Sequence, residues 1–228
     1  MNIFAKTATP LLTFSALLVL SLPVAATENI SFFSGNGPIN TLDPIVRFIS
    51  TGACCNEFPA FTPGHFAAAA SGPAATIIGA AHPFWTPDLS CNPGTDEAGQ
   101  WVGVAPGGVP ETALYAVTFN VQTTCILYAE LHICWMVDDA LGSPNNPAGL
   151  YLNGNPIPAV AGGNFATSTL AGPISVGAFL TPGLNTLYLY NADIGSAVSG
   201  VNFRVRLIVE ECELPVEPSS WSGIKARF

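Results

Sequence analysis

Bulky apolar residues alternate with smaller or polar ones along several short stretches of the second half of the chain. In ALYAVTFNV, residues 113–121, the bulky positions are Tyr115, Val117, Phe119 and Val121, and the positions between the last three are polar. Successive side chains of a β-strand point to opposite faces of a sheet. This period of two therefore predicts a strand with one buried face.

The stretch CILYAELHICWMV, residues 125–137, carries the same period over a longer run. One set of alternate positions is apolar, and we expect it to face the core: Leu127, Leu131, Ile133, Trp135 and Val137. The other set is expected to face the opposite way: Tyr128, Glu130, His132, Cys134 and Met136.

Further segments complete the predicted fold. Residues 201–210, VNFRVRLIVE, alternate again, and GLYLNG and LNTLYLYN are shorter strand patterns beside turn signals. Gly-Pro ends the alanine run within residues 65–81. The segment can therefore be either a short helix or a loop that leads directly into a strand. Several antiparallel strands with Gly/Pro turns and no long helix predict an all-β, antiparallel β-sandwich.

The first 26 residues have the features of an export signal. Lys6 precedes an uncharged apolar run, and the small residues Val24 and Ala26 suit cleavage after Ala26. A retained anchor is the alternative, but the polar sequence TEN follows at once. We therefore expect a signal peptide over 1–26, one sandwich domain over 27–212 and a flexible tail over 213–228. The predicted location is secreted or at the cell surface, with no transmembrane anchor after cleavage.

The net charge of the chain limits the kinds of molecule that it can bind. The 228-residue chain has 6 Lys and Arg against 15 Asp and Glu, and loss of Lys6 with the signal leaves 5 − 15 = −10. Nucleic acids and anionic membrane surfaces are bound through basic patches. The acidic balance therefore argues against both as partners.

The six cysteines are even in number, which in an exported chain predicts disulfides. They are Cys54, Cys55, Cys91, Cys125, Cys134 and Cys212. We expect Cys54 and Cys55 to pair elsewhere, because a bond between neighbours is strained. Cys125 and Cys134 lie too far apart along one strand, at about 3.3 Å per residue, to bridge.

Several motifs resemble a bacterial exported jelly-roll domain, similar to galactose-binding-like sandwiches and found in PEP-CTERM-type surface proteins. They stand in order as FWTPDLSC, AGQWVGV, LYAVTFNV, WMVDDALG, GLYLNG, GNFATSTL, TPGLNTLYLYNAD and VNFRVRLIVE, over a little more than half of the chain. The resemblance implies a jelly roll and carbohydrate as a ligand class. The tail lacks the apolar helix and Arg cluster of a PEP-CTERM sorting signal, and a jelly roll hosts many functions.

The adjacent carboxylates Asp138 and Asp139 end an apolar run before a Pro/Asn-rich loop. They could cap the turn, bind a structural Ca²⁺ ion together with loop carbonyls, or act as acid and base. Adjacent residues of a strand point to opposite faces, which disfavours catalysis. We favour turn capping, with Ca²⁺ as the one cofactor considered, and we expect Asn153-Gly154 to form a turn.

The strand face with Tyr128, Glu130 and His132 is the predicted ligand site. If Arg204 and Arg206 lie on the same sheet, they add planar cationic groups to an aromatic, a combination suited to glycans. An ordinary solvent-facing sheet with a Glu–Arg pair is the alternative. Trp85 and Trp101 are sugar platforms or packing residues, and we favour packing.

These features predict a secreted, non-catalytic module that binds an extracellular glycan or another surface protein at the cell surface or in a matrix. One alternative is a self-assembling structural subunit of an extracellular layer or filament, with residues 27–45 donated to a neighbour. The other is a glycan-acting hydrolase, in which Glu130 would work with an acidic loop residue.

Overall fold

The computed structural model describes residues 26–52, 54–94, 99–195 and 197–212, and these residues form a mostly β structure. The expected signal peptide and tail lie outside the described residues, apart from Ala26. The elements, in chain order, are β1 (Thr27–Phe33), β2 (Leu42–Ser50), α1 (Pro63–Ala70), β3 (Ala74–Ile77), β4 (Val102–Gly103), β5 (Ala113–Val121), β6 (Ile126–Asp138), β7 (Ala140–Leu141), β8 (Leu150–Leu152), β9 (Asn155–Pro156), β10 (Thr169–Ser175), the 3₁₀ turn η1 (Gly177–Phe179), β11 (Gly183–Ala192) and β12 (Gly200–Glu211).

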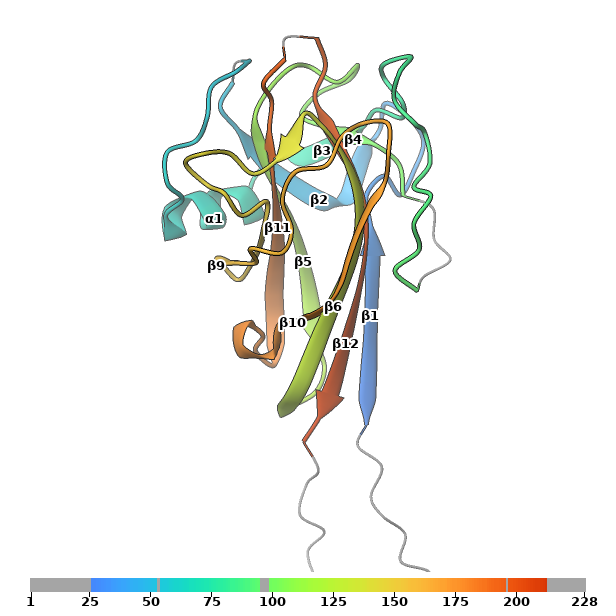
Figure 1. The fold of residues 1–228 in the computed structure, drawn as a ribbon. Helices are drawn as coiled ribbons and strands as arrows, with labels where there is room; N and C mark the ends of the chain where they lie inside the picture. Colours follow the sequence, from blue (N-terminus) through green and yellow to red (C-terminus); the bar gives the residue numbers. More distant parts are fainter. Residues whose placement is uncertain (1–25, 53, 95–98, 196, 213–228) are drawn as a thin grey trace, which may run out of the picture.

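The twelve strands form one curled antiparallel sheet with two long arms. The strand order is β10-β6-β12-β4-β3-β2-β5-β11-β8-β9, with β1 added to β12 and β7 to β11. The short strands β3 and β4 join the arms at one end (Figure 1). The arms pack face to face, and apolar side chains from both form one continuous core. This arrangement confirms the predicted all-β sandwich.

Segment 27–45, the proposed donor strand, is built into this chain's own sheet. β1 pairs with β12 from Thr27 opposite Glu210 to Phe33 opposite Arg204, and β2 pairs with β5. The Glu28 carboxylate also accepts the backbone N–H groups of residues 122 and 123, at 2.9–3.3 Å. The N-terminal stretch therefore closes the sandwich.

Strand β6 follows the predicted alternation except at its start. Leu131, Ile133, Trp135 and Val137 are buried in the core, but Leu127 is 64% exposed. The pairing of β6 with β12 shifts at this point, so Leu127 falls in a β-bulge. A bulge inserts an unpaired residue and changes which face the side chains before it occupy. Expecting Leu127 in the core was therefore wrong.

The opposite face of β6 is only partly open to solvent. Cys134 and Met136 are fully buried under the segment that carries Trp85 and Trp101, and together they form a second apolar cluster. The two indoles stack with their ring centroids 4.1 Å apart. The expectation that both tryptophans are packing residues is confirmed.

The alanine run forms a helix, α1. His65 Nδ1 accepts the backbone N–H of Thr62 at 3.2 Å, which satisfies a donor at the helix start. Gly72 follows the helix, where a Cβ atom would collide with the carbonyl oxygen of Phe48. The chain can therefore leave α1 and pass directly into β3. One side of the helix covers an aromatic cluster on the outer face of β5 and β11.

Three disulfides are present, Cys91–Cys134, Cys125–Cys212 and Cys54–Cys55. The prediction that the two neighbours pair elsewhere is wrong. Cys91 and Cys134 lie 5.9 Å apart between Cα atoms and the other long-range pair 5.3 Å, both within normal bridging range, so only the neighbours remain. The expectation that Cys125 and Cys134 do not bridge is confirmed.

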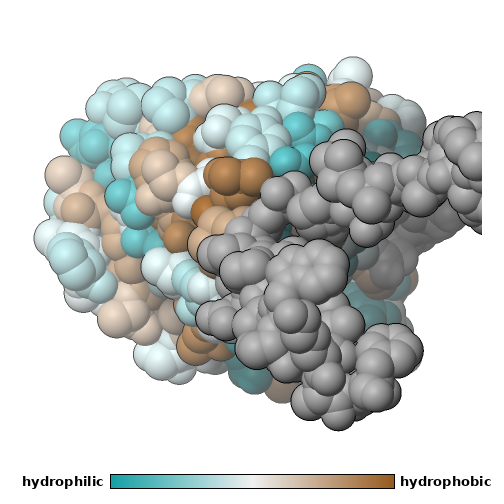
Figure 2. All heavy atoms as spheres, turned by 90° about the horizontal axis from the view of Figure 1, so that it is seen from below, coloured by the Kyte–Doolittle hydropathy of each residue, from teal (hydrophilic) through white to brown (hydrophobic). Residues whose placement is uncertain are grey.

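None of the helices that the structure describes has the length and apolar character needed to cross a bilayer. The lower end of the sandwich, viewed in Figure 2, intersperses hydrophobic and hydrophilic residues over the coloured part of its surface.

Candidate functional site

The predicted strand-face residues do lie on adjacent strands of one sheet. His132 of β6 is opposite Arg206 of β12, and Tyr128 is opposite Glu210. Glu130 connects the β6 residues, because its carboxylate lies 3.0 Å from His132 Nε2 and accepts the Tyr128 hydroxyl at 3.4 Å. Glu130 is therefore the centre of a small polar cluster that includes Tyr128 and His132.

The two arginines differ in accessibility. Arg206 is half-buried and donates to Asn29 Oδ1 on β1 at 3.0 Å. Its guanidinium also lies against Gly94, where a Cβ atom would come within 2.5 Å of Nη1. Arg204 is only 8% exposed, opposite the buried Cys134. The site predicted on this face therefore presents Tyr128, Glu130, His132 and part of Arg206 to solvent.

Asp138 and Asp139 both organise the structure around them. Asp138 Oδ2 accepts the indole N–H of Trp85 at 2.8 Å. Asp139 Oδ2 accepts the backbone N–H groups of Ile194 and Gly195 at 2.7 and 2.5 Å. These bonds fit the capping role favoured from the sequence, although the turn that Asp139 caps lies after β11 rather than directly after β6.

The electrostatics of this region are unusual for a surface loop. Burial raises the pKa of Asp138 to about 7, a hydrogen bond from its protonated form to Asp139 acts the same way, and the Trp85 indole opposes both. Burial and the Asp139 charge raise the pKa of Asp193 to about 6.

Over the described part of the chain, no three His, Cys, Asp or Glu side chains are grouped to hold a metal ion. Calcium at Asp138 and Asp139 therefore stays a prediction.

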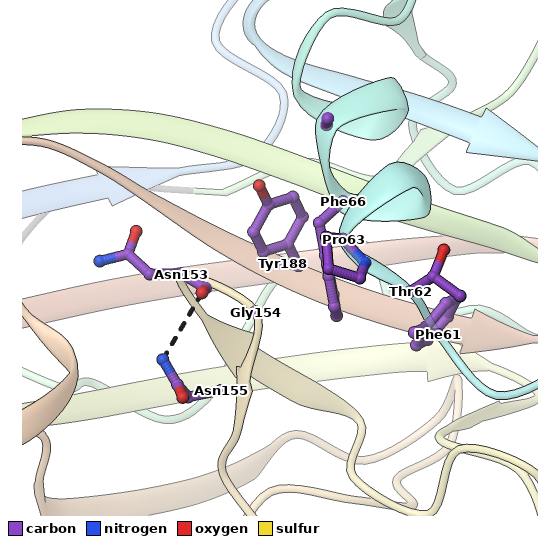
Figure 3. A pocket seen from close by; sticks show the side chains of 9 residues that line it. Phe61, Thr62, Pro63, Phe66, Asn153, Gly154, Asn155 and Tyr188 are labelled. Atoms are coloured by element: carbon purple, nitrogen blue, oxygen red, sulfur yellow. Dashed lines mark hydrogen bonds between the residues drawn. The ribbon is translucent and has the colours of Figure 1, made fainter.

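A groove that the sequence did not point to lies between α1 and the β8–β9 hairpin. Its volume is about 520 Å³. It is lined by Phe61, Thr62, Pro63, Phe66, Ala67, Asn153, Gly154, Asn155 and Tyr188, none of which is charged. Figure 3 shows the rings of Phe66 and Tyr188 side by side, with the hairpin turn across from them.

Aromatic packing fixes the rings of this groove. Phe66 and Tyr188 have ring centroids 4.8 Å apart, and Phe66 is 5.5 Å from Phe61. Tyr151 stands behind Phe66 at 5.3 Å. Tyr188 is 6% exposed and Phe66 half-buried, so the rings offer edges and parts of faces supported by a rigid cluster. Such a surface is pre-organised for binding.

The hairpin supplies the polar rim of the groove. The Asn153 amide holds the turn, since it donates to Phe179 and Asn185 and accepts from Thr186 at 2.7–2.8 Å. Asn153 has a φ of 51°, which agrees with the expected Asn-Gly turn. Asn155 is exposed and uses only its Nδ2 group, on Leu152 and Asn153 (Figure 3). Its amide oxygen accepts no hydrogen bond within the described residues, which leaves it available to a ligand.

Sequence reasoning missed this groove because its parts are far apart along the chain. Phe61 and Phe66 flank the short helix, and Tyr188 lies on β11, more than a hundred residues later. The only local signal was the aromatic pair spaced five residues apart around Thr62-Pro63 at a helix start.

No protein-family model matches the sequence, and no curated protein matches it significantly. Among solved structures, the isomalto-dextranase of Arthrobacter globiformis T6 complexed with panose is similar at 15% sequence identity, with a TM-score of 0.26. The similarity covers 81% of this chain and 32% of that one, so this chain spans about a third of the length of the enzyme. A likeness this distant carries no argument about function.

Proposed function

We propose that this protein is a secreted, non-catalytic carbohydrate-binding module of a cell surface or matrix, and that it binds glycan in the groove between α1 and the β8–β9 hairpin. The observation that carries the proposal is the composition of that groove: fixed aromatic rings on one side and an uncharged polar rim on the other. Sugars present C–H faces that pack on aromatic rings and hydroxyls that pair with amides and hydroxyl groups.

The lining favours a neutral glycan and binding rather than hydrolysis. With no carboxylate or histidine in it, the groove lacks the pair of acidic groups that glycoside hydrolysis requires. It also lacks a cation that would recognise a phosphate or a uronic acid. Its volume is in the range of small-molecule sites, which suits one or two sugar rings.

The strand face around Glu130 is a weaker candidate for the same function. Tyr128 is its one aromatic, and Glu130 and His132 already satisfy one another. The three disulfides support the export part of the proposal, because such bonds persist in oxidising compartments.

A glycan array probed with the oxidised full chain tests the proposal. We expect binding to neutral glycans, no release of reducing sugar from any bound glycan, and weaker signals for Asn155→Ala. A variant of an exposed residue far from the groove, Glu210→Gln, serves as the matched control and should bind as the parent does. Absence of binding to every glycan would reject the proposal, and sugar release would replace it with a hydrolase.

A further inference from the structure

A set of buried oxygen atoms at the end of β11 lacks hydrogen-bond partners. Asp193 is 3% exposed and Asn191 fully buried. Both carboxylate oxygens of Asp193 and the amide oxygen of Asn191 are buried and accept no hydrogen bond from the residues that the structure describes. The backbone N–H of Gly195 donates to Asp139 and also acts on Asp193, whose pKa it lowers against the effect of burial.

Hydrogen bonds hold the side chain of Asn191 and the backbone of Asp193. Asn191 Nδ2 donates to Ser199 Oγ at 2.9 Å, which fixes its amide and the direction of its oxygen. The backbone N–H of Asp193 donates to Thr112 Oγ1 at 3.1 Å. The Asn191 amide oxygen and the backbone that carries Asp193 are therefore held in a buried region, where an unpaired acceptor is unfavourable.

The surroundings add more oxygen and no positive charge. Tyr115 is the diagonal neighbour of Asn191 across the β5–β11 pairing, and its buried hydroxyl also lacks a partner. The Asp139 carboxylate is close enough to act on Asp193 electrostatically. Over the described residues, no Lys or Arg forms a salt bridge with either aspartate. A buried negative charge without a positive partner is unfavourable.

We propose that Asp193 and Asn191 bind a Ca²⁺ ion, with the Tyr115 hydroxyl and the Asp139 carboxylate at its edge. Ca²⁺ takes six to eight oxygen ligands and accepts a mixture of carboxylate, amide and backbone oxygens in flexible geometry. All of the unpartnered acceptors here are oxygens, which disfavours zinc. The site needs no group of three acidic side chains, because the neutral amide oxygen of Asn191 serves as one of the ligands.

This site differs from the one expected at Asp138 and Asp139. Asp138 Oδ2 accepts from Trp85, and Asp139 Oδ2 already accepts two backbone N–H groups. The bound ion would instead join the end of β11 to the turn that Asp139 caps. Asp193 also lines a small cavity of about 110 Å³ beside Cys55 and Glu57, a route by which an ion could enter.

The test is isothermal titration of CaCl₂ into the full, oxidised chain after chelator treatment, together with thermal unfolding with and without the ion. We expect one Ca²⁺ per chain and a higher melting temperature. Asp193→Asn keeps the shape and removes the charge, and it should weaken binding at least tenfold, equal to about 1.4 kcal/mol. Glu210→Gln, an exposed carboxylate on β12, should bind Ca²⁺ as the parent does.

Two results would overturn the proposal. The first is no heat and no change in melting temperature up to about 10 mM Ca²⁺, above the range of weak extracellular sites. The second is unchanged Ca²⁺ binding in Asp193→Asn, which would place the ion elsewhere. If Asp193→Asn fails to fold, sensitised luminescence of Tb³⁺, a Ca²⁺ substitute, in the parent chain gives the answer: quenching by added Ca²⁺ supports the site, and no signal rejects it.

Discussion

Replacing both Cys91 and Cys134 by alanine removes a bond that ties the tryptophan-bearing segment to β6. The bond joins residues 43 apart in the sequence, and Cys125–Cys212 joins residues 87 apart. The loop-closure entropy removed from the unfolded chain predicts losses of about 4 kcal/mol for the first pair and about 4.6 kcal/mol for the second. The neighbouring pair, Cys54–Cys55, closes almost no loop, and its removal should cost little.

Denaturant unfolding followed by tryptophan fluorescence measures all three double variants on one scale. The expected order of destabilisation is Cys125/Cys212, slightly above Cys91/Cys134, with Cys54/Cys55 far below both. Because Cys134 is fully buried, its loss adds a small packing penalty to the first figure. A Cys54/Cys55 variant as unstable as the other two would refute the loop-closure reasoning and assign the pair a larger structural role.

Three further predictions concern individual residues. Trp85→Phe leaves Asp138 Oδ2 without its indole donor and a void where the larger ring packed, and should lower the free energy of unfolding by more than about 1–3 kcal/mol in the same denaturant assay. Burial raises the pKa of Tyr151 from 10.0 to about 12, so the folded state holds this proton more tightly and stability should fall as pH rises from 10 through 12; a melting temperature flat over that range would contradict it. Gly72→Ala forces a Cβ atom onto the carbonyl of Phe48 and should cost at least about 1–3 kcal/mol by calorimetry, whereas a neutral result would mean that the α1–β3 junction relaxes freely.

The main strands could be predicted because their hydrophobic period is local. The predicted core-facing positions of β5, β6 and β12 do face the core, and the exception at Leu127 arises from a bulge set by the pairing with β12. The prediction of one buried face for β5 was wrong over Ala113–Val117, because α1 and the aromatic cluster cover the other face as well. Nothing in the sequence of one strand specifies where its partner skips a residue. The burial of Cys134 and Met136 was hidden for a similar reason, since a distant segment covers that face.

The candidate sites were less accessible to sequence reasoning. The groove combines residues from α1, the β8–β9 hairpin and β11, which only the folded chain brings together. No local pattern in the sequence points to Asp193, because its significance depends on burial without a hydrogen-bond partner among the described residues. The alternation along residues 201–210 predicted that Arg204 lies on the solvent-facing side of its strand. In the structure it is buried, because another segment covers that part of the sheet. In each case, burial and pairing between distant segments decide the role.

The most direct test of carbohydrate binding in the groove is isothermal titration of the strongest glycan from the array into matched variants. Phe66→Ala removes the ring beside Tyr188, and Tyr128→Ala removes the exposed aromatic of the strand face. We predict at least tenfold weaker binding for Phe66→Ala, about 1.4 kcal/mol, and unchanged affinity for Tyr128→Ala. Full affinity in folded Phe66→Ala, with loss in Tyr128→Ala, would contradict the proposed site and move it to the strand face.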